Sequence, residues 1–158
     1  MKCLQAGAIA VSFALIPALI PNVAHTTEAA GEGAGAKASP LITDHFVTPS
    51  GKIQCQATTE QLRCELTTGS SLNPVPPRPS SCDLDWGQGL ILDRANAVQV
   101  LCAGDTILRP REGSTTLAYG RTWQWERFTC KVERSGLICL NLGRKGFFLS
   151  TQRWRAID

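Results

Sequence analysis

The stretch GKIQCQATTEQLRCEL, residues 51–66, decides the fold, because eight residues separate its two cysteines. Cys55 and Cys64 are predicted to lie directly opposite each other in a β-hairpin. Side chains alternate between the two faces of a strand. This register therefore separates apolar from polar residues, and a shift by one residue would destroy the separation. One face would hold both cysteines with Ile53, Ala57, Leu62 and Leu66, and the other Gln54, Gln56, Arg63 and Glu65.

A second stretch, ERFTCKVERSGLICLN (126–141), repeats this spacing. Pairing Cys130 with Cys139 places Phe128, Val132 and Leu137 on the same face as the two cysteines. Gly136 then falls in the turn, where a positive φ is often required. Two hairpins that pass the same test indicate an internal pseudo-repeat, although the residues around the cysteines differ.

The third cysteine pair is Cys82 with Cys102. The sequence GLILDRANAVQVLC (89–102) predicts two strands around RANA, which brings their outer ends together. In the chain-entropy model each closed loop stabilises the fold by roughly 3 kcal/mol. Zinc sites and dithiol catalysts favour closely spaced ligands or C-x-x-C, and the chain contains no C-x-x-C. We therefore expect structural disulfides, no metal and no cofactor.

The N-terminal region differs from the rest of the chain in composition. Lys2 precedes a mostly apolar run at residues 4–20, which predicts a secretory signal peptide over residues 1–29. The alternative is an uncleaved N-terminal anchor, but the run is short and interrupted for a membrane span. An Ala/Gly-rich flexible linker is expected at 30–40 and a single disulfide-rich β domain at 41–158. Of the seven cysteines, Cys3 falls in the predicted signal peptide and six remain. Six cysteines in an exported chain indicate a secreted or periplasmic protein of the cell envelope, with no membrane span after cleavage.

Short segments rich in β-branched and aromatic residues dominate the predicted domain, and turn signals separate them. No segment has a sustained helical period. The fold class is therefore all-β, a small antiparallel sandwich or barrel built from disulfide-stapled hairpins. The proline run NPVPPRPSS (73–81) predicts an extended, polyproline-like connection. The expected strands are HFVT, KIQCQA, QLRCEL, LILD, VQVLCA, TWQWERFTCKV, LICLNL and GFFLS.

The motifs FVTPSGKIQC, LRCEL, PVPPRPSSCDLDWG, CAGDT, LAYGRT and CLNLGRKGFFLS occur in this order. They resemble a bacterial domain-of-unknown-function family of small exported six-cysteine proteins, with the pattern TPSGxIxC, CxxDWG, CxGDT, YG and GFxLS. The resemblance covers roughly residues 46–150 and departs at Lys52, where Asn is expected, and at Thr151, where a basic residue is common. It implies export and the cysteine framework, but no activity. The residues that carry it are Thr48, Pro49, Ser50, Gly51, Ile53, Cys55, Asp85, Trp86, Gly87, Gly104, Asp105, Thr106, Tyr119, Gly120, Gly146, Phe147, Leu149 and Ser150.

Candidate catalytic groups are few. His45 is the one histidine of the predicted domain, and the chain has no G-x-S-x-G elbow. Asp83, Asp85 and Asp105 are the best carboxylates, and the third disulfide would bring Asp83 near Asp105. A glycosidase needs two carboxyl groups about 5–9 Å apart. We expect these aspartates to cap turns instead, with calcium binding and acid catalysis as the alternatives.

Charge is distributed unevenly along the predicted domain. Residues 41–108 include four basic and seven acidic residues, whereas residues 109–158 include ten basic and four acidic ones. A net charge of −3 against +6 can direct an anionic partner to the C-terminal third. The partner class we expect is an anionic glycan or envelope polymer, and no nucleic acid.

The segment TWQWERFTCKV (122–132) is predicted to form one continuous strand. The face opposite Phe128 would then carry aromatic and basic residues, and a groove of Trp and Arg side chains can hold a glycan or polyanion. The alternative is a second core in which Trp125 is buried. The five candidate ligand-binding residues are Trp123, Trp125, Arg127, Lys131 and Arg144.

The leading functional hypothesis is an exported, non-catalytic binding or structural module at the cell envelope or outside the cell. The sequence favours a protein without catalytic activity, but it does not decide whether the protein is an enzyme. One alternative is a small secreted hydrolase that uses Asp83, Asp85 or Asp105. Another is an enzyme inhibitor that presents a stapled hairpin.

Overall fold

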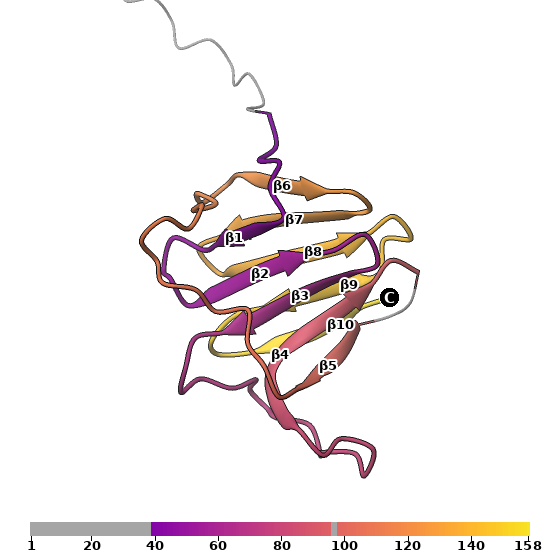
Figure 1. Cartoon of the computed structure of the whole chain (residues 1–158). Coiled ribbons are helices and arrows are strands. Elements are labelled where there is room, and N and C mark those ends of the chain that lie inside the picture. The colour runs from indigo at the N-terminus through magenta and orange to yellow at the C-terminus, as the bar shows by residue number, and fades with distance from the viewer. Residues whose placement is uncertain (1–38, 96–97) are drawn as a thin grey trace, which may run out of the picture. The chain divides into compact units, whose positions relative to one another are not determined.

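The computed structural model describes residues 39–95 and 98–158, which form two antiparallel sheets of five strands each (Figure 1). The predicted signal peptide and nearly all of the predicted linker lie outside the described residues. Each sheet is a simple meander, in which every strand pairs with its neighbours in sequence. In the part of the chain that the structure describes, no helix is long and apolar enough to cross a membrane.

The ten strands divide evenly between the sheets. The first sheet contains β1 (His45–Val47), β2 (Ile53–Ala57), β3 (Gln61–Leu66), β4 (Asp85–Asp93) and β5 (Val98–Ala103). The second sheet contains β6 (Thr122–Trp125), β7 (Phe128–Glu133), β8 (Gly136–Asn141), β9 (Gly146–Leu149) and β10 (Trp154–Ile157). The predicted all-β class and antiparallel sandwich are confirmed.

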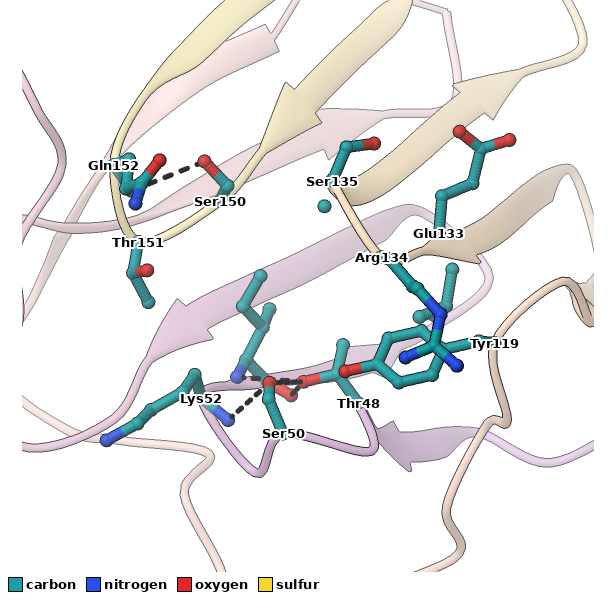
Figure 2. Close-up of a pocket in the computed structure, with 13 residues that line it drawn as sticks. Thr48, Ser50, Lys52, Tyr119, Glu133, Arg134, Ser135, Ser150, Thr151 and Gln152 are labelled. Carbon is teal, nitrogen blue, oxygen red and sulfur yellow. Dashed lines mark hydrogen bonds between the residues drawn. The ribbon is translucent and has the colours of Figure 1, made fainter.

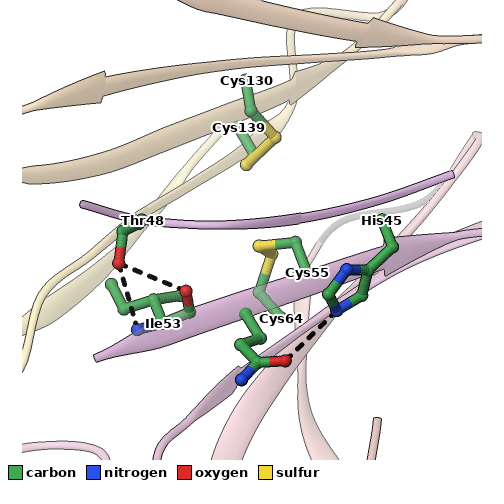
Figure 3. The surroundings of a disulfide bond; sticks show 8 residues. His45, Thr48, Ile53, Cys55, Cys64, Cys130 and Cys139 are labelled. Carbon is green, nitrogen blue, oxygen red and sulfur yellow. Dashed lines mark hydrogen bonds between the residues drawn. A yellow bond between two sulfur atoms is a disulfide. The ribbon is translucent and has the colours of Figure 1, made fainter. Parts of the chain in front are cut away.

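Both predicted hairpin registers are confirmed. Cys55 lies opposite Cys64 between β2 and β3, and Cys130 lies opposite Cys139 between β7 and β8. Each pair forms a disulfide, and the two disulfides lie on the facing sides of the two sheets (Figure 3). All four cysteines are fully buried within one hydrophobic core that both sheets build.

The third disulfide joins Cys82 to Cys102 as predicted. It lies where β4 begins and β5 ends. The first of these strands starts at Asp85, earlier than the predicted LILD segment, and its pairing with β5 shifts register between Trp86 and Leu90. Gly87 and Gly89 weaken the strand signal there, since glycine is disfavoured in regular strands and common at bulges.

Residues 104–117, named here the strap, cover the outer face of the first sheet. Backbone hydrogen bonds join Val47 N–H to Thr115 O and Leu117 N–H to Val47 O, both at 2.9 Å. Beneath the strap, three outward polar side chains of β1, β2 and β3 are buried, namely His45, Gln54 and Glu65. The strap therefore shields a polar face that a two-layer sandwich would otherwise leave in water.

The prediction of one strand over residues 122–132 is wrong. The chain turns back at Glu126 and Arg127, so that β6 and β7 form a hairpin in which Trp125 lies opposite Phe128. Glu126 adopts a φ of 47° at this turn, a conformation that sequence rules associate with Gly or Asn. The turn puts Trp123 and Trp125 on the same face as Cys130 and Phe128, which is the core face.

Candidate functional site

The turns at one end of the sandwich enclose a pocket of about 260 Å³ (Figure 2). In an antiparallel meander alternate turns fall at the same end of a sheet. The pocket therefore gathers the β1–β2 turn of the first sheet with the β7–β8 and β9–β10 turns of the second. Three segments that carry the family resemblance meet here, namely TPSG at 48–51, YG at 119–120 and LS at 149–150, and the pocket is also lined by Lys52 and Thr151, the two positions that depart from the pattern.

Two cations lie on opposite sides of this pocket, Lys52 and Arg134 (Figure 2). Among the described residues neither forms an ion pair, whereas the carboxylate of Glu133 is paired with Lys131 at 2.9 Å. The guanidinium of Arg134 lies 5.0 Å from the ring centroid of Tyr119, which holds the cation beside the pocket by a cation–π contact. The pocket is thus electropositive.

Some of the hydroxyl groups in the pocket walls stabilise the turns themselves. Thr48 Oγ1 accepts a hydrogen bond from the backbone N–H of Ile53 at 3.2 Å, and Ser150 Oγ accepts one from Arg153 N–H at 3.1 Å. In the described part of the chain, the hydroxyls of Tyr119, Ser135 and Thr151 make no hydrogen bond to protein. The walls therefore present spare donors to a ligand.

The three candidate catalytic aspartates lie close in sequence to the Cys82–Cys102 disulfide, and all are exposed to solvent. Asp83 and Asp85 flank the start of β4, and Asp105 follows the end of β5. Asp105 pairs with Arg63 at 2.9 Å, and the hydrogen bond and charge of that guanidinium lower the pKa of Asp105. Neither the pocket above nor a second one beside β6 includes any of the three.

His45 is buried under the strap and not in a cleft. Its Nε2 lies 3.2 Å from Gln54 Oε1 (Figure 3). That amide also accepts from Arg109 N–H and donates to Arg109 O, both at 2.9 Å. Because Oε1 is an acceptor, the imidazole donates through Nε2 and is held in one tautomer. Burial lowers the pKa of His45, and the nearby charge of Arg109 lowers it further.

A second buried network fixes the strap to β3. Glu65, 1% exposed, accepts hydrogen bonds from the Thr106 hydroxyl and from Ile107 N–H. Its Oε1 also lies 2.6 Å from Arg63 Nε. Through these contacts and the Arg63–Asp105 pair, the strap residues 105–107 are attached to β3. Among the described residues no cluster of three or more His, Cys, Asp or Glu side chains could hold a metal ion.

The structure does not bring the five candidate ligand-binding residues together. Trp123 is 0% exposed, stacks near Phe46 at 4.9 Å between ring centroids, and donates its indole N–H to Thr43 O. Trp125 is half-buried against the core. Lys131 is exposed on the outer face of the second sheet, whereas Arg127 and Arg144 are exposed in turns at the end opposite the pocket.

The sequence analysis did not predict three of the pocket residues as functional, namely Lys52, Tyr119 and Arg134. They belong to three turns that are far apart in the chain, and no local motif of charge or spacing joins them. The available signal was the strand count, since turns that lie an even number of strands apart share one end of a meander.

Residues 29–156 match the model of a family of unknown function, DUF6636. The chain belongs to this family. The DUF6636 match includes every described strand except the last residue of β10, and therefore the whole pocket. No curated protein and no solved structure is significantly similar to the chain.

Proposed function

We propose that this DUF6636 protein is an exported, non-catalytic binding module that recognises an anionic glycan or envelope polymer. The observation that carries the proposal is the pocket whose walls include two cations without carboxylate partners among the described residues, Lys52 and Arg134, together with spare hydroxyl donors. Charge-assisted hydrogen bonds from such donors are the strong ones for carboxylate or phosphate groups. Export is supported by three disulfides, which persist in oxidising compartments.

The size of the pocket favours one terminal unit of a polymer. Ligand sites commonly measure about 300–1,000 Å³, and this pocket lies just below that range. A single acidic sugar residue is a ligand of suitable size and charge. From Glu133 at the pocket, outward side chains of β7 continue through Lys131 towards Arg127 at the far turn. In this proposal the rest of the polymer follows that strand, and Arg144 in the neighbouring turn adds a contact.

Titration of the purified domain with free glucuronate, monitored by NMR or calorimetry, tests the pocket. We expect weak saturable binding, which a neutral glucoside does not reproduce. Lys52→Ala and Arg134→Ala should each weaken glucuronate binding about tenfold, since each removes one charge-assisted contact. Lys145→Ala, which removes an exposed cation at the other end, is the matched control and should bind as the wild type does.

Chromatography on an immobilised polyuronate tests the extended surface. Elution should shift to lower salt for Arg127→Ala combined with Lys131→Ala, because exposed charges are screened over about 8 Å at physiological salt. Glucuronate titration of Arg127→Ala alone should be unchanged, because that variant keeps Lys131, the partner of the Glu133 carboxylate at the pocket. Equal affinity for acidic and neutral sugars, or unchanged binding by both pocket variants, would contradict the proposed function.

A further inference from the structure

The connection between β3 and β4 contains a proline loop, defined here as residues 73–79 with the sequence NPVPPRP. The connection projects beyond the strands at the lower end of the view in Figure 1. Four of the seven loop residues are prolines. Each proline ring restricts φ to one narrow range, so the loop has few conformations to lose on binding.

Both sheets hold the inner side of this loop. The indole N–H of Trp86 on β4 donates to Pro76 O, and that of Trp154 on β10 donates to Pro74 O, each at 2.9 Å. Asn73 Nδ2 donates to Gln152 O at 3.0 Å. Two tryptophans from different sheets therefore fix carbonyl groups two residues apart, and the loop is attached to the sandwich as a rigid element.

Close packing and a disulfide fix the two ends of the loop. A Cβ atom at Gly87 would come within 2.7 Å of Val75 Cγ1, so the loop rests directly on the backbone of β4. Arg78 Nε donates to Cys82 O at 2.7 Å, and Cys82 is bonded to Cys102. The Arg78 backbone is thereby held relative to β5, while the outer nitrogens of its guanidinium make no hydrogen bond among the described residues.

The outer side of the loop presents Pro77, Arg78 and Pro79 to solvent, with Leu84 52% exposed beside its base. Two overlapping P-x-x-P arrangements occur, at 74–77 and 76–79. In polyproline recognition, proline rings enter slots between aromatic side chains and an adjacent cation pairs with a carboxylate. A loop already held in place costs less conformational entropy to bind than a free peptide does.

We propose that the proline loop docks this domain onto a protein partner whose surface has an aromatic-lined groove flanked by a carboxylate. The half-buried Pro76 and the exposed Pro79, which form the second P-x-x-P arrangement, would occupy the groove, and the free nitrogens of Arg78 would pair with the acid. This site is independent of the proposed anion pocket, because no residue of the loop lines that pocket.

The test uses the full domain with an isolated SH3 domain as the probe, since SH3 domains carry such a groove. NMR spectra of the labelled SH3 domain should shift at groove residues on addition of wild type. Arg78→Ala and the double variant Pro76→Ala with Pro79→Ala should each bind about tenfold more weakly or worse, because they remove the charge pair and the ring contacts. Arg144→Ala, an equal charge change in a distant turn, should bind like wild type.

Melting temperatures of all variants exclude loss of the fold as the cause, and the glucuronate titration of the loop variants should be unaltered. No shift with wild type, or equal shifts with wild type and Arg78→Ala, would overturn the docking proposal. Shifts confined to residues outside the groove would overturn it too, since a docking loop has to engage the groove.

Discussion

The first five strands and the last five strands repeat one plan. In each half an aromatic residue on the first strand lies opposite a cysteine on the second, Phe46 opposite Cys55 and Trp123 opposite Cys130. The second cysteine then lies opposite a buried apolar residue on the fourth strand, Leu90 or Phe147.

Glycine on the fourth strand is also repeated. Gly89 lies opposite Glu65, and Gly146 lies opposite Leu140, in each case the residue that follows the second cysteine. A Cβ atom at either glycine would collide with the carbonyl oxygen of that cysteine. The repeat that the cysteine spacing indicated therefore extends across four strands of each sheet.

The halves differ in what surrounds this shared plan. The β3–β4 connection of the first half runs from residue 67 to residue 84 and includes the proline loop, whereas the equivalent β8–β9 turn spans only residues 142–145. The outward position after the second cysteine is Glu65 in the first half and Leu140 in the second. A carboxylate at that position requires partners when buried, and the strap supplies them. The two halves thus share one scaffold, and the residues on the outer face of each sheet determine whether another segment covers that face.

The sharpest test of the shared plan is the pair of matched glycines. Gly146→Ala would place Cβ 1.9 Å from Cys139 O, and Gly89→Ala would place it 2.3 Å from Cys64 O. Both obstacles are backbone, so we expect each variant to lose about 3 kcal/mol or more of unfolding free energy. Denaturant unfolding measures this. Gly104→Ala, whose nearest contact is a Leu84 methyl at 3.4 Å, is the control and should change little, and tolerance of one glycine variant alone would break the equivalence.

The two buried disulfides provide the next comparison. Each closes a loop with a sequence separation of 9, so the chain-entropy model gives them equal effects. Replacing both cysteines of either pair with alanine should cost about 2–5 kcal/mol, with the two double variants agreeing within about 1 kcal/mol. Removal of both partners avoids a free thiol. If one half unfolds while the other retains its stability, the two sheets do not form a single cooperative core.

The success of the hairpin predictions and the failure at Trp123 have one physical basis. The Cys55 and Cys130 registers follow from local alternation of apolar and polar residues, which the sequence displays. The turn at Glu126 contains no glycine or asparagine, so the sequence has no local signal for it. Burial of Trp123 against Phe46 compensates for the conformational cost of the positive φ at Glu126. Tertiary packing overrides local preference there, so a single-strand interpretation placed both tryptophans on the wrong face.

Contacts between distant segments explain why the sequence did not predict the pocket or the role of the strap. The pocket joins Lys52 to Arg134, and the strap joins Glu65 to Thr106. No period or motif links such pairs, because only the final arrangement of the sheets brings them together. Trp154 is a further case, since it lies at the start of β10 and donates its indole N–H to Pro74 O, 80 residues earlier in the chain.

The outward faces of the two sheets can be compared through the unfolding free energies of Glu65→Ala and Leu140→Ala. Loss of the Glu65 carboxylate leaves the Thr106 hydroxyl and Ile107 N–H without their acceptor and removes the ion pair of Arg63 Nε, although the outer nitrogens of Arg63 keep Asp105. We expect a cost of about 2–3 kcal/mol, as for a charged hydrogen-bonded group. Leu140 is partly exposed, and its truncation should cost about 1 kcal/mol. Amide hydrogen exchange should show faster exchange of the strap in Glu65→Ala only, and equal costs would mean that the strap contributes little.

The smallest expected effect is a pH dependence confined to the first half. His45 is neutral beneath the strap, and burial followed by the charge of Arg109 lowers its pKa from 6.5 in the native state. The unfolded chain therefore binds a proton more readily than the native protein does below about pH 6.5. Unfolding free energy should fall as pH decreases from 6.5 towards the lowered native pKa. Above pH 6.5, His45 should contribute no pH dependence to the unfolding free energy.

His45→Gln separates this contribution from others, since glutamine does not titrate and its amide can still donate to Gln54. The variant should lose the decrease between pH 6.5 and the native pKa but keep any decrease below about pH 4. That lower range belongs to carboxylates such as Asp105, whose pKa is held below 3.8 by the Arg63 hydrogen bond and charge, and whose contribution is lost only on further acidification. Denaturant unfolding across this pH range, with strap exchange as a local probe, distinguishes the two. A decrease of equal size in wild type and His45→Gln would place the titrating group elsewhere and remove His45 as a difference between the halves.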